Sequence, residues 1–134
     1  MNFQEDVRRG HENVRRRVIQ AIRRISIEAA NDVISISPVD TGRFRGNWQS
    51  SINTPNFAIN DALDPSGQAS LLEAEFVISG FNEGDVYFLS NSLPYARRLE
   101  FGFSLQAPSP PGIVRRAAQR SRELQTQVFA QLRP

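Results

Sequence analysis

The stretch VRRRVIQAIRRISIEAANDVISISP, residues 14–38, defines the first element of the predicted fold. Apolar side chains recur in it at every third or fourth position, at Val14, Val18, Ile22, Ile25, Ala29 and Val33. This spacing places them along one face of an α-helix, which can then pack against the rest of the protein. Pro38 disfavours helical geometry in the residue before it. The sequence therefore predicts one long helix over residues 3–36.

The central part of the chain has the shorter patterns of β-strands. Trp48 and Ile52 alternate with polar side chains, which is typical of a strand with one buried face. The dipeptides around Gly84 suit a tight hairpin turn. The predicted elements are, in order, a strand at 47–53, a segment at 71–81 that begins as helix or turn and becomes a strand through Phe76 and Ile78, a turn at 82–85 and a strand at 86–91.

The carboxyl-terminal part returns to helix. Residues 94–100 suit one or two helical turns, residues 102–112 form a proline-rich loop, and residues 113–132 form a closing helix. The side chains of this helix that face inward are Ala117, Ala118, Leu124 and Val128. The order of elements predicts a single α+β domain over residues 1–134, in which an antiparallel β-sheet packs against the long N-terminal helix and the C-terminal helix.

Composition excludes several classes of protein. The chain has no cysteine, which excludes disulfides, thiolate catalysis and cysteine-ligated metals. No apolar run is long enough to span a bilayer, and the first residues lack the apolar core of a signal peptide, so we expect a cytoplasmic protein. All 16 basic residues are arginine. Arginine suits interfaces because it makes planar, bidentate contacts with carboxylates and phosphates, although biased genomic composition would produce the same set.

Candidate catalytic and metal-binding residues are sparse. His11, the single histidine, lies in the arginine-rich helix, where we expect it to face solvent. Asp61 and Asp64 are too few for a calcium cage, and helix or turn capping explains them better. Glu73 and Glu75 would share one face of a strand as ordinary solvated carboxylates. With no P-loop or Rossmann glycine pattern either, the sequence predicts no enzyme, no cofactor and no metal site.

The arginines of the first helix offer one alternative function, DNA binding. They lie at positions 8, 9, 15, 16, 17, 23 and 24, among the acidic residues Glu5, Asp6, Glu12 and Glu28. Contacts with phosphates would make such binding strongly dependent on salt. No helix-turn-helix, zinc finger or aromatic base-stacking platform accompanies them, so a solvated helix flank is the simpler interpretation.

Two segments carry a more specific signal. They are SPVDTGRFRGNWQ, residues 37–49, and NSLPYARRLEFGFSLQAPSPPGIVRRA, residues 91–117. Together they resemble the neck and tail-completion proteins of tailed bacteriophages, minor tail components that join the head to the tail. In that family a long helix precedes a Pro-Val-Asp-Thr-Gly-Arg turn. A later strand leads into Asn-x-x-Pro-Tyr-Ala, which is followed by Leu-Glu-Phe/Tyr-Gly, by Gln-Ala-Pro and by a helix that starts with Gly, an apolar residue, Val and Arg. The corresponding positions here are Pro38–Arg43, Asn91–Ala96, Leu99–Gly102, Gln106–Pro108 and Gly112–Arg115.

The resemblance implies a structural protein of the virion, with no catalytic residues. Its subunits would form a homo-oligomeric ring at the head–tail junction, as a neck protein or as a tail terminator. The partners implied are the connector or neck proteins and the tail tube or sheath proteins. A tail-side position implies six copies, and a portal-side position implies twelve. The protein would be made in the host cytoplasm, bind no membrane, and meet DNA only where DNA passes through the channel.

Charged residues of the two segments are expected to pair. We expect Arg43 or Arg45 to form an ion pair with an acidic residue, and Glu100 is the favoured partner because the two segments should meet at the edge of the sheet. Arg97 and Arg98 are the alternative partners for this carboxylate. Removing one partner of a desolvated pair is costly, so the pair would matter for stability or assembly.

Two connections have expected roles in the backbone. Asp40, Thr41 and Gly42 have the chemistry of a turn that reverses the chain between helix and sheet. Residues 54–70 are rich in Asn, Asp, Pro, Ser and Gly and form a long loop. We expect Asn56–Ser70 to be mobile in a free subunit and to become ordered on assembly, because it has little apolar area to bury.

Apolar residues of the second segment divide into two groups. Leu99 is expected in the core together with Trp48 of the first segment, and core burial would also suit Tyr95. Burial within one subunit is less favoured in the loop bounded by glycine and proline, and a neighbouring subunit would cover it. The residues of this loop are Phe101, Gly102, Phe103 and Leu105.

Overall fold

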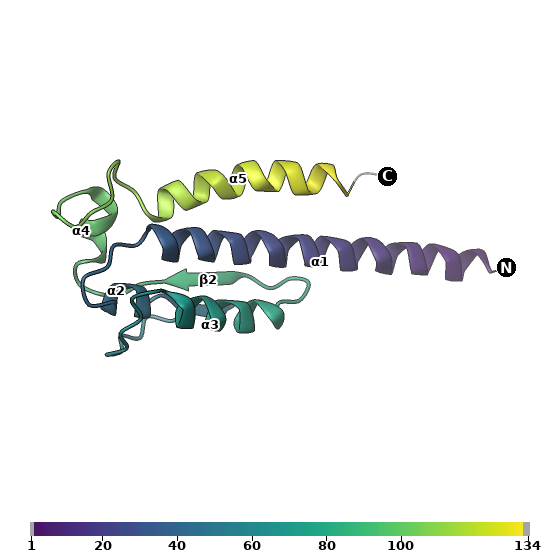
Figure 1. Cartoon of the computed structure of the whole chain (residues 1–134). Coiled ribbons are helices and arrows are strands. Elements are labelled where there is room, and N and C mark those ends of the chain that lie inside the picture. Colours follow the sequence, from purple (N-terminus) through teal and green to yellow (C-terminus); the bar gives the residue numbers. More distant parts are fainter. Residues whose placement is uncertain (1, 133–134) are drawn as a thin grey trace.

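The computed structural model describes residues 2–132, and its longest element is helix α1, Phe3–Ile36 (Figure 1). The side-chain oxygen of Asn2 caps the start of α1 by accepting a hydrogen bond from the N–H of Gln4 at 3.0 Å. At the other end, the Ser37 hydroxyl donates to the C=O of Val33 at 2.7 Å. The predicted helix over residues 3–36 is confirmed.

Other elements pack against two sides of helix α1. Helix α5, Val114–Ala130, lies on one side, and helix α3, Gln68–Ser79, lies on the other side together with the sheet (Figure 1). Ile25 packs with Val128 of α5, whereas Ala30 packs with Ala74 of α3. The prediction of one buried stripe was therefore incomplete, because the helix buries two faces. Val14, which belongs to that stripe, is 58% exposed.

The β-sheet has two antiparallel strands among the described residues. Strand β1, Gln49–Ile52, pairs with β2, Tyr87–Ser90, so that Gln49 lies opposite Ser90. Both strands fall within the ranges predicted for them, and the fold is mixed α+β and mostly helical. None of the helices in residues 2–132 is long and apolar enough to cross a membrane.

The prediction of a third strand through Phe76 and Ile78 was wrong, because these residues belong to helix α3. In a strand, residues 74, 76 and 78 would share one face. Instead Ala74 and Ile78, four residues apart, are buried against α1, and Phe76 between them is 79% exposed. This is helical spacing, and α1 provides the surface that selects it. The turn around Gly84 therefore joins a helix to β2 rather than two strands.

Helix α3 determines the surroundings of three carboxylates, Asp64, Glu73 and Glu75. The expectation that capping explains Asp64 is confirmed, because its Oδ2 accepts a hydrogen bond from the N–H of Ser70 at 2.8 Å, in the first turn of α3. The long loop accordingly ends at Gly67, three residues earlier than predicted. Glu73 and Glu75 do not share a face, because two residues apart on a helix point in different directions.

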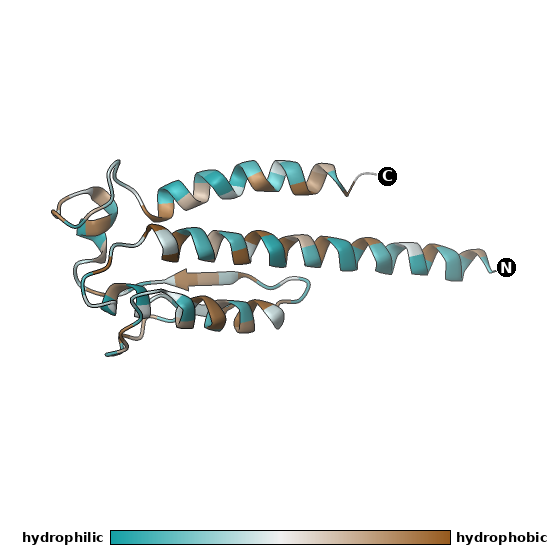
Figure 2. Ribbon diagram, viewed as in Figure 1, coloured by the Kyte–Doolittle hydropathy of each residue, from teal (hydrophilic) through white to brown (hydrophobic). Residues whose placement is uncertain are grey.

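The main core lies where the carboxyl end of α1 meets two short helices. These are α2, Arg43–Gly46, and α4, Ala96–Phe101. The sequence predicted a helical turn at α4 but only a tight connection at α2. The buried apolar side chains of this core are Val33, Ile34, Phe44, Trp48, Leu93, Leu99, Ile113 and Ala117. Figure 2 shows the apolar residues of α1 as separate bands along the helix, with further apolar colour on β2 and α3.

Candidate interaction site

The two motif segments meet in space around Phe44 of α2. The Phe44 ring lies edge-on to the Trp48 ring at 5.7 Å between centroids and tilted against the Tyr95 ring at 6.0 Å. The indole N–H of Trp48 donates to the Ser37 hydroxyl at 2.9 Å, which satisfies this polar group inside the core. Trp48 and Leu99 are buried, as predicted, and Tyr95 is partly exposed. The segments therefore form one continuous structure.

The Asp40-Thr41-Gly42 turn brings α2 against the long loop. The Thr41 hydroxyl accepts a hydrogen bond from the N–H of Arg43 at 3.3 Å, and the C=O of Gly42 accepts one from the N–H of Asp64 at 3.0 Å. Gly42 has a φ of 91°, and a Cβ there would lie 2.5 Å from the Pro65 nitrogen. The position therefore requires glycine, both for its conformation and for the close approach.

Arg45 anchors the carboxyl end of α1. Its guanidinium donates to the C=O groups of Ser37 at 2.9 Å, Pro65 at 2.9 Å and Ser35 at 3.1 Å. Two of these carbonyls are at the end of α1, where the helix itself provides no donors. Arg45 therefore does not pair with Glu100 as predicted, because each of its three guanidinium nitrogens donates to a backbone carbonyl instead.

Replacing Arg45 by lysine is expected to lower the free energy of unfolding by about 1–3 kcal/mol, because one ammonium group cannot reach three carbonyls in different directions. Chemical denaturation would measure the loss. Arg24→Lys is the control, because Arg24 forms an exposed ion pair with Glu28 at 3.5 Å and such a pair contributes little. Equal stability of the two variants would contradict this role for Arg45.

Arg43 does not pair with Glu100 either. The acidic group nearest to its guanidinium is the exposed carboxylate of Asp61, at 4.0 Å. A contact of that length with a solvated group is weak. The expectation that one of the two arginines pairs with an acidic residue is therefore met by Arg43 and Asp61, but the favoured partner, Glu100, was wrong for both.

Glu100 instead caps helix α5. Its carboxylate accepts hydrogen bonds from the backbone N–H groups of Ile113 at 2.7 Å, Val114 at 2.8 Å and Arg115 at 3.2 Å. The Arg115 side chain adds an ion pair at 3.1 Å. Partial burial of the carboxyl group opposes ionisation, but these donors outweigh it and hold the pKa of Glu100 below its usual value. The sequence missed Arg115 as the partner, although its position one residue after the start of a helix made it available.

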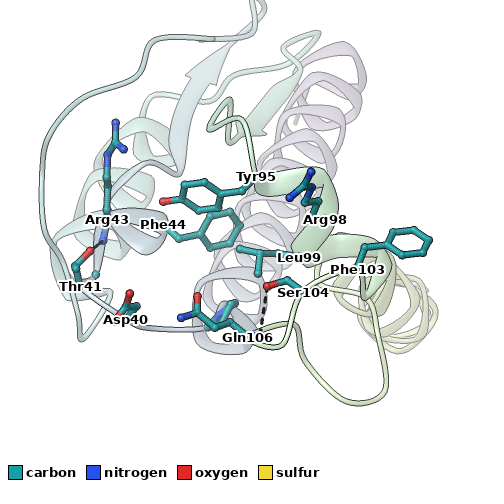
Figure 3. A pocket seen from close by; sticks show the side chains of 12 residues that line it. Asp40, Thr41, Arg43, Phe44, Tyr95, Arg98, Leu99, Phe103, Ser104 and Gln106 are labelled. Carbon is teal, nitrogen blue, oxygen red and sulfur yellow. Dashed lines mark hydrogen bonds between the residues drawn. The ribbon is translucent and has the colours of Figure 1, made fainter.

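A cavity of about 330 Å³ lies beside these segments (Figure 3). Phe44, Tyr95, Leu99 and Phe103 supply its apolar lining, and in Figure 3 the Phe103 ring extends away from the other labelled side chains. Polar groups complete the lining, among them Asp40, Thr41, Arg43, Arg98, Ser104 and Gln106. Aromatic and charged side chains therefore line the cavity together.

The loop after α4 exposes large apolar side chains. Phe103 is 80% exposed and Leu105 is fully exposed, whereas Phe101 is shielded in part by the guanidinium groups of Arg97 at 5.7 Å and Arg115 at 4.6 Å from its ring. These distances suit cation–π contacts. At Gly102 the chain takes a φ of 82°, which ends α4 and directs the loop outward. The expectation of poor burial within the subunit is confirmed for this loop.

The described residues hold few groups for other chemistry. Residues 2–132 contain no cluster of three or more His, Asp or Glu side chains that could bind a metal ion. His11 is exposed on α1, as expected. Comparisons of the chain with protein-family models, with curated proteins and with solved structures find no match.

Proposed function

We propose that the protein is a ring-forming component of the head–tail junction of a tailed phage, a role that involves no catalysis. The observation that carries this proposal is the surface formed by the two resembling segments. They lie far apart in the sequence, yet they line one cavity together, and the second segment includes the exposed loop with Phe103 and Leu105. Exposed apolar groups of this kind, rimmed by charges, are typical of a surface that another subunit covers.

A head-to-tail contact between identical subunits explains the form of this surface. Such a contact joins two different patches, so it repeats around an axis and closes into a ring when the rotation per subunit allows. The exposed loop would be one patch, and its partner would lie on the next subunit. By the resemblance, six copies fit a tail-side ring and twelve fit a portal-side ring.

Disrupting the gene in the phage that carries it tests the proposal. We expect lysates with filled heads and separate tails, and we expect purified protein to restore joined particles. Tails of uncontrolled length would indicate the terminator position, and tails of normal length would indicate the neck. Normal infectious particles without the protein, or a position away from the head–tail axis in particle images, would contradict the proposal.

The exposed arginines of α1 favour a second candidate, an accessory protein that binds DNA. Arg8, Arg15 and Arg24 already form ion pairs with glutamates, which reduces the charge available to phosphates. The two candidates differ in salt dependence. Phosphate-driven binding should fall steeply between low and high salt, whereas binding to a protein partner through apolar groups should persist.

A further inference from the structure

The amino-terminal part of α1 extends beyond the other elements (Figure 1). Phe3, Val7 and Val14 are 79%, 52% and 58% exposed. At 3.6 residues per turn these three and Val18 lie within about 60° of one another around the helix. They form an apolar stripe, which we call the α1 stripe, that residues 2–132 of the same chain leave largely uncovered.

The same face of α1 continues into the body of the protein, where α5 covers it. Ala21 and Ile25 follow the α1 stripe at helical spacing and are buried with Val128 of α5. Helix α5 runs antiparallel to α1, so that Arg120 pairs with Asp32 at 2.8 Å and α5 ends at Ala130. The uncovered part of the stripe therefore begins where α5 ends. A further antiparallel helix could continue the packing on this face.

Gly10 is the second sign of a partner. A glycine inside an exposed helix costs about 1 kcal/mol relative to alanine. A Cβ added at Gly10 would meet nothing within 4 Å, so no contact with the described residues requires glycine here. A position without a side chain lets the backbone of another helix approach closely.

We propose that a second copy of this chain covers the α1 stripe, with the two α1 helices antiparallel about a two-fold axis between Gly10 and His11. The stripe is symmetric about that point. Phe3 and Val18 are equally far from it, and so are Val7 and Val14. Each Val7 would therefore face the Val14 of the other copy. The second helix would occupy, on the free part of α1, the side that α5 occupies further along.

The charges on α1 favour this direction. Glu5 and Asp6 lie near its start, and Arg15–Arg17 lie near the end of the free part. Antiparallel pairing brings these unlike groups to the same level, and parallel pairing would bring like groups together. Asp6 and Arg17 also lie within about 20° of each other around the helix, so they would pair across one flank of the dimer, twice by symmetry.

Like charges approach on the opposite flank, where Arg8 and Arg15 of different copies would lie near each other. Both arginines already have acidic neighbours, Arg8 with Glu12 at 3.2 Å and Arg15 with Glu83 at 3.7 Å. These ion pairs offset the repulsion. The net charge pattern therefore still favours the antiparallel pair.

This contact is independent of the head-to-tail contact in the proposed ring. A two-fold contact uses the same patch on both copies and closes at two. It involves α1, whereas the loop with Phe103 lies at the other end of the molecule (Figures 1 and 3). Loss of pairing would therefore leave the head–tail proposal untouched, and the reverse also holds.

Disulfide cross-linking tests the register, because the chain has no cysteine of its own. We expect an equal mixture of Val7→Cys and Val14→Cys proteins to form the mixed disulfide under mild oxidation, and neither protein alone to cross-link comparably. Arg9→Cys in place of Val7→Cys is the control, because Arg9 lies on the opposite face. Efficient cross-linking of Val7→Cys alone would show parallel helices, and no cross-link above the control would contradict pairing; either result overturns the proposal.

Sedimentation measures the association itself. We expect the full chain to contain a dimer that Val14→Glu weakens roughly tenfold or more, because the variant buries an unpaired charge. Asn13→Glu, beside the stripe, should have a much smaller effect. Both variants should fold, because both positions are exposed in the subunit, and unfolding curves would verify this. A monomeric wild-type chain at about 100 μM, or equal association of the two variants, would overturn the proposal.

Discussion

Replacing Glu100 by alanine is expected to lower the free energy of unfolding by about 2–3 kcal/mol, which is large for a domain of marginal stability. The reason is that one carboxylate satisfies three backbone N–H groups at the start of α5 and the Arg115 side chain. Its removal leaves these donors without a partner and frees the loop that leads into α5. Chemical denaturation at neutral pH would measure the loss.

Glu75→Ala is the matched control, because Glu75 is an exposed helical glutamate on α3. Glu100→Gln should lose less than Glu100→Ala, because the amide keeps one acceptor oxygen but no charge. If Glu100→Ala is no less stable than Glu75→Ala, the capping role is wrong.

The stability contributed by Glu100 should also depend on pH. The folded state lowers the pKa of this carboxyl group, so the unfolded chain binds its proton at a higher pH than the folded protein does. The contribution is therefore fully present above the unfolded pKa of about 4.3, and it is lost as the pH falls through the lower folded pKa. The stability difference between wild type and Glu100→Gln should shrink below this range.

Replacing both Phe103 and Leu105 by aspartate is expected to abolish the joining of heads to tails while leaving the subunit folded. Both side chains are already in solvent, so the substitutions should change the free energy of unfolding by only about 0.5 kcal/mol. In a covered interface the same carboxylates would be buried without partners, at a cost of several kcal/mol. Adding the purified variant to lysates that lack the protein would measure joined particles directly.

Phe76→Asp provides the control for that experiment. Phe76 is as exposed as Phe103, but it lies on α3, outside the two motif segments. It should support joining as the wild-type protein does. Equal loss of joining in both variants would point to a general effect of surface charge, and full activity of the double variant would contradict a role for the loop.

Local patterns in the sequence determined the elements that have a long apolar repeat or a clear stop signal such as proline or glycine. Helix α1 repeats its apolar spacing over many turns and is stopped by Pro38, so its bounds could be predicted. The same holds for the turn at Gly42, where glycine supplies a positive φ. Trp48 and Leu99 could be assigned to the core, because each belongs to a predicted strand or helical turn that needs a buried apolar face.

Tertiary structure alone decided whether residues 74–78 are helix or strand. A short apolar run suits both, and the helix-favouring residues at the start of the segment do not say how far the helix continues. Ala30 of α1 has a small side chain, and Ala74 and Ile78 pack against it from one face of a helix. The sequence therefore predicted the fold class but too large a sheet.

Tertiary structure also decided how the charges of the candidate site are arranged. The sequence identified Arg45, Glu100 and the exposed loop as candidate site residues, but it predicted an ion pair between Arg45 and Glu100. In the folded chain Arg45 lies at the carbonyl end of α1, and Glu100 lies at the N–H end of α5. Each takes the unsatisfied backbone groups nearest to it. Periodicity along a chain encodes which face is apolar, whereas the partner of a charge depends on where distant segments come together.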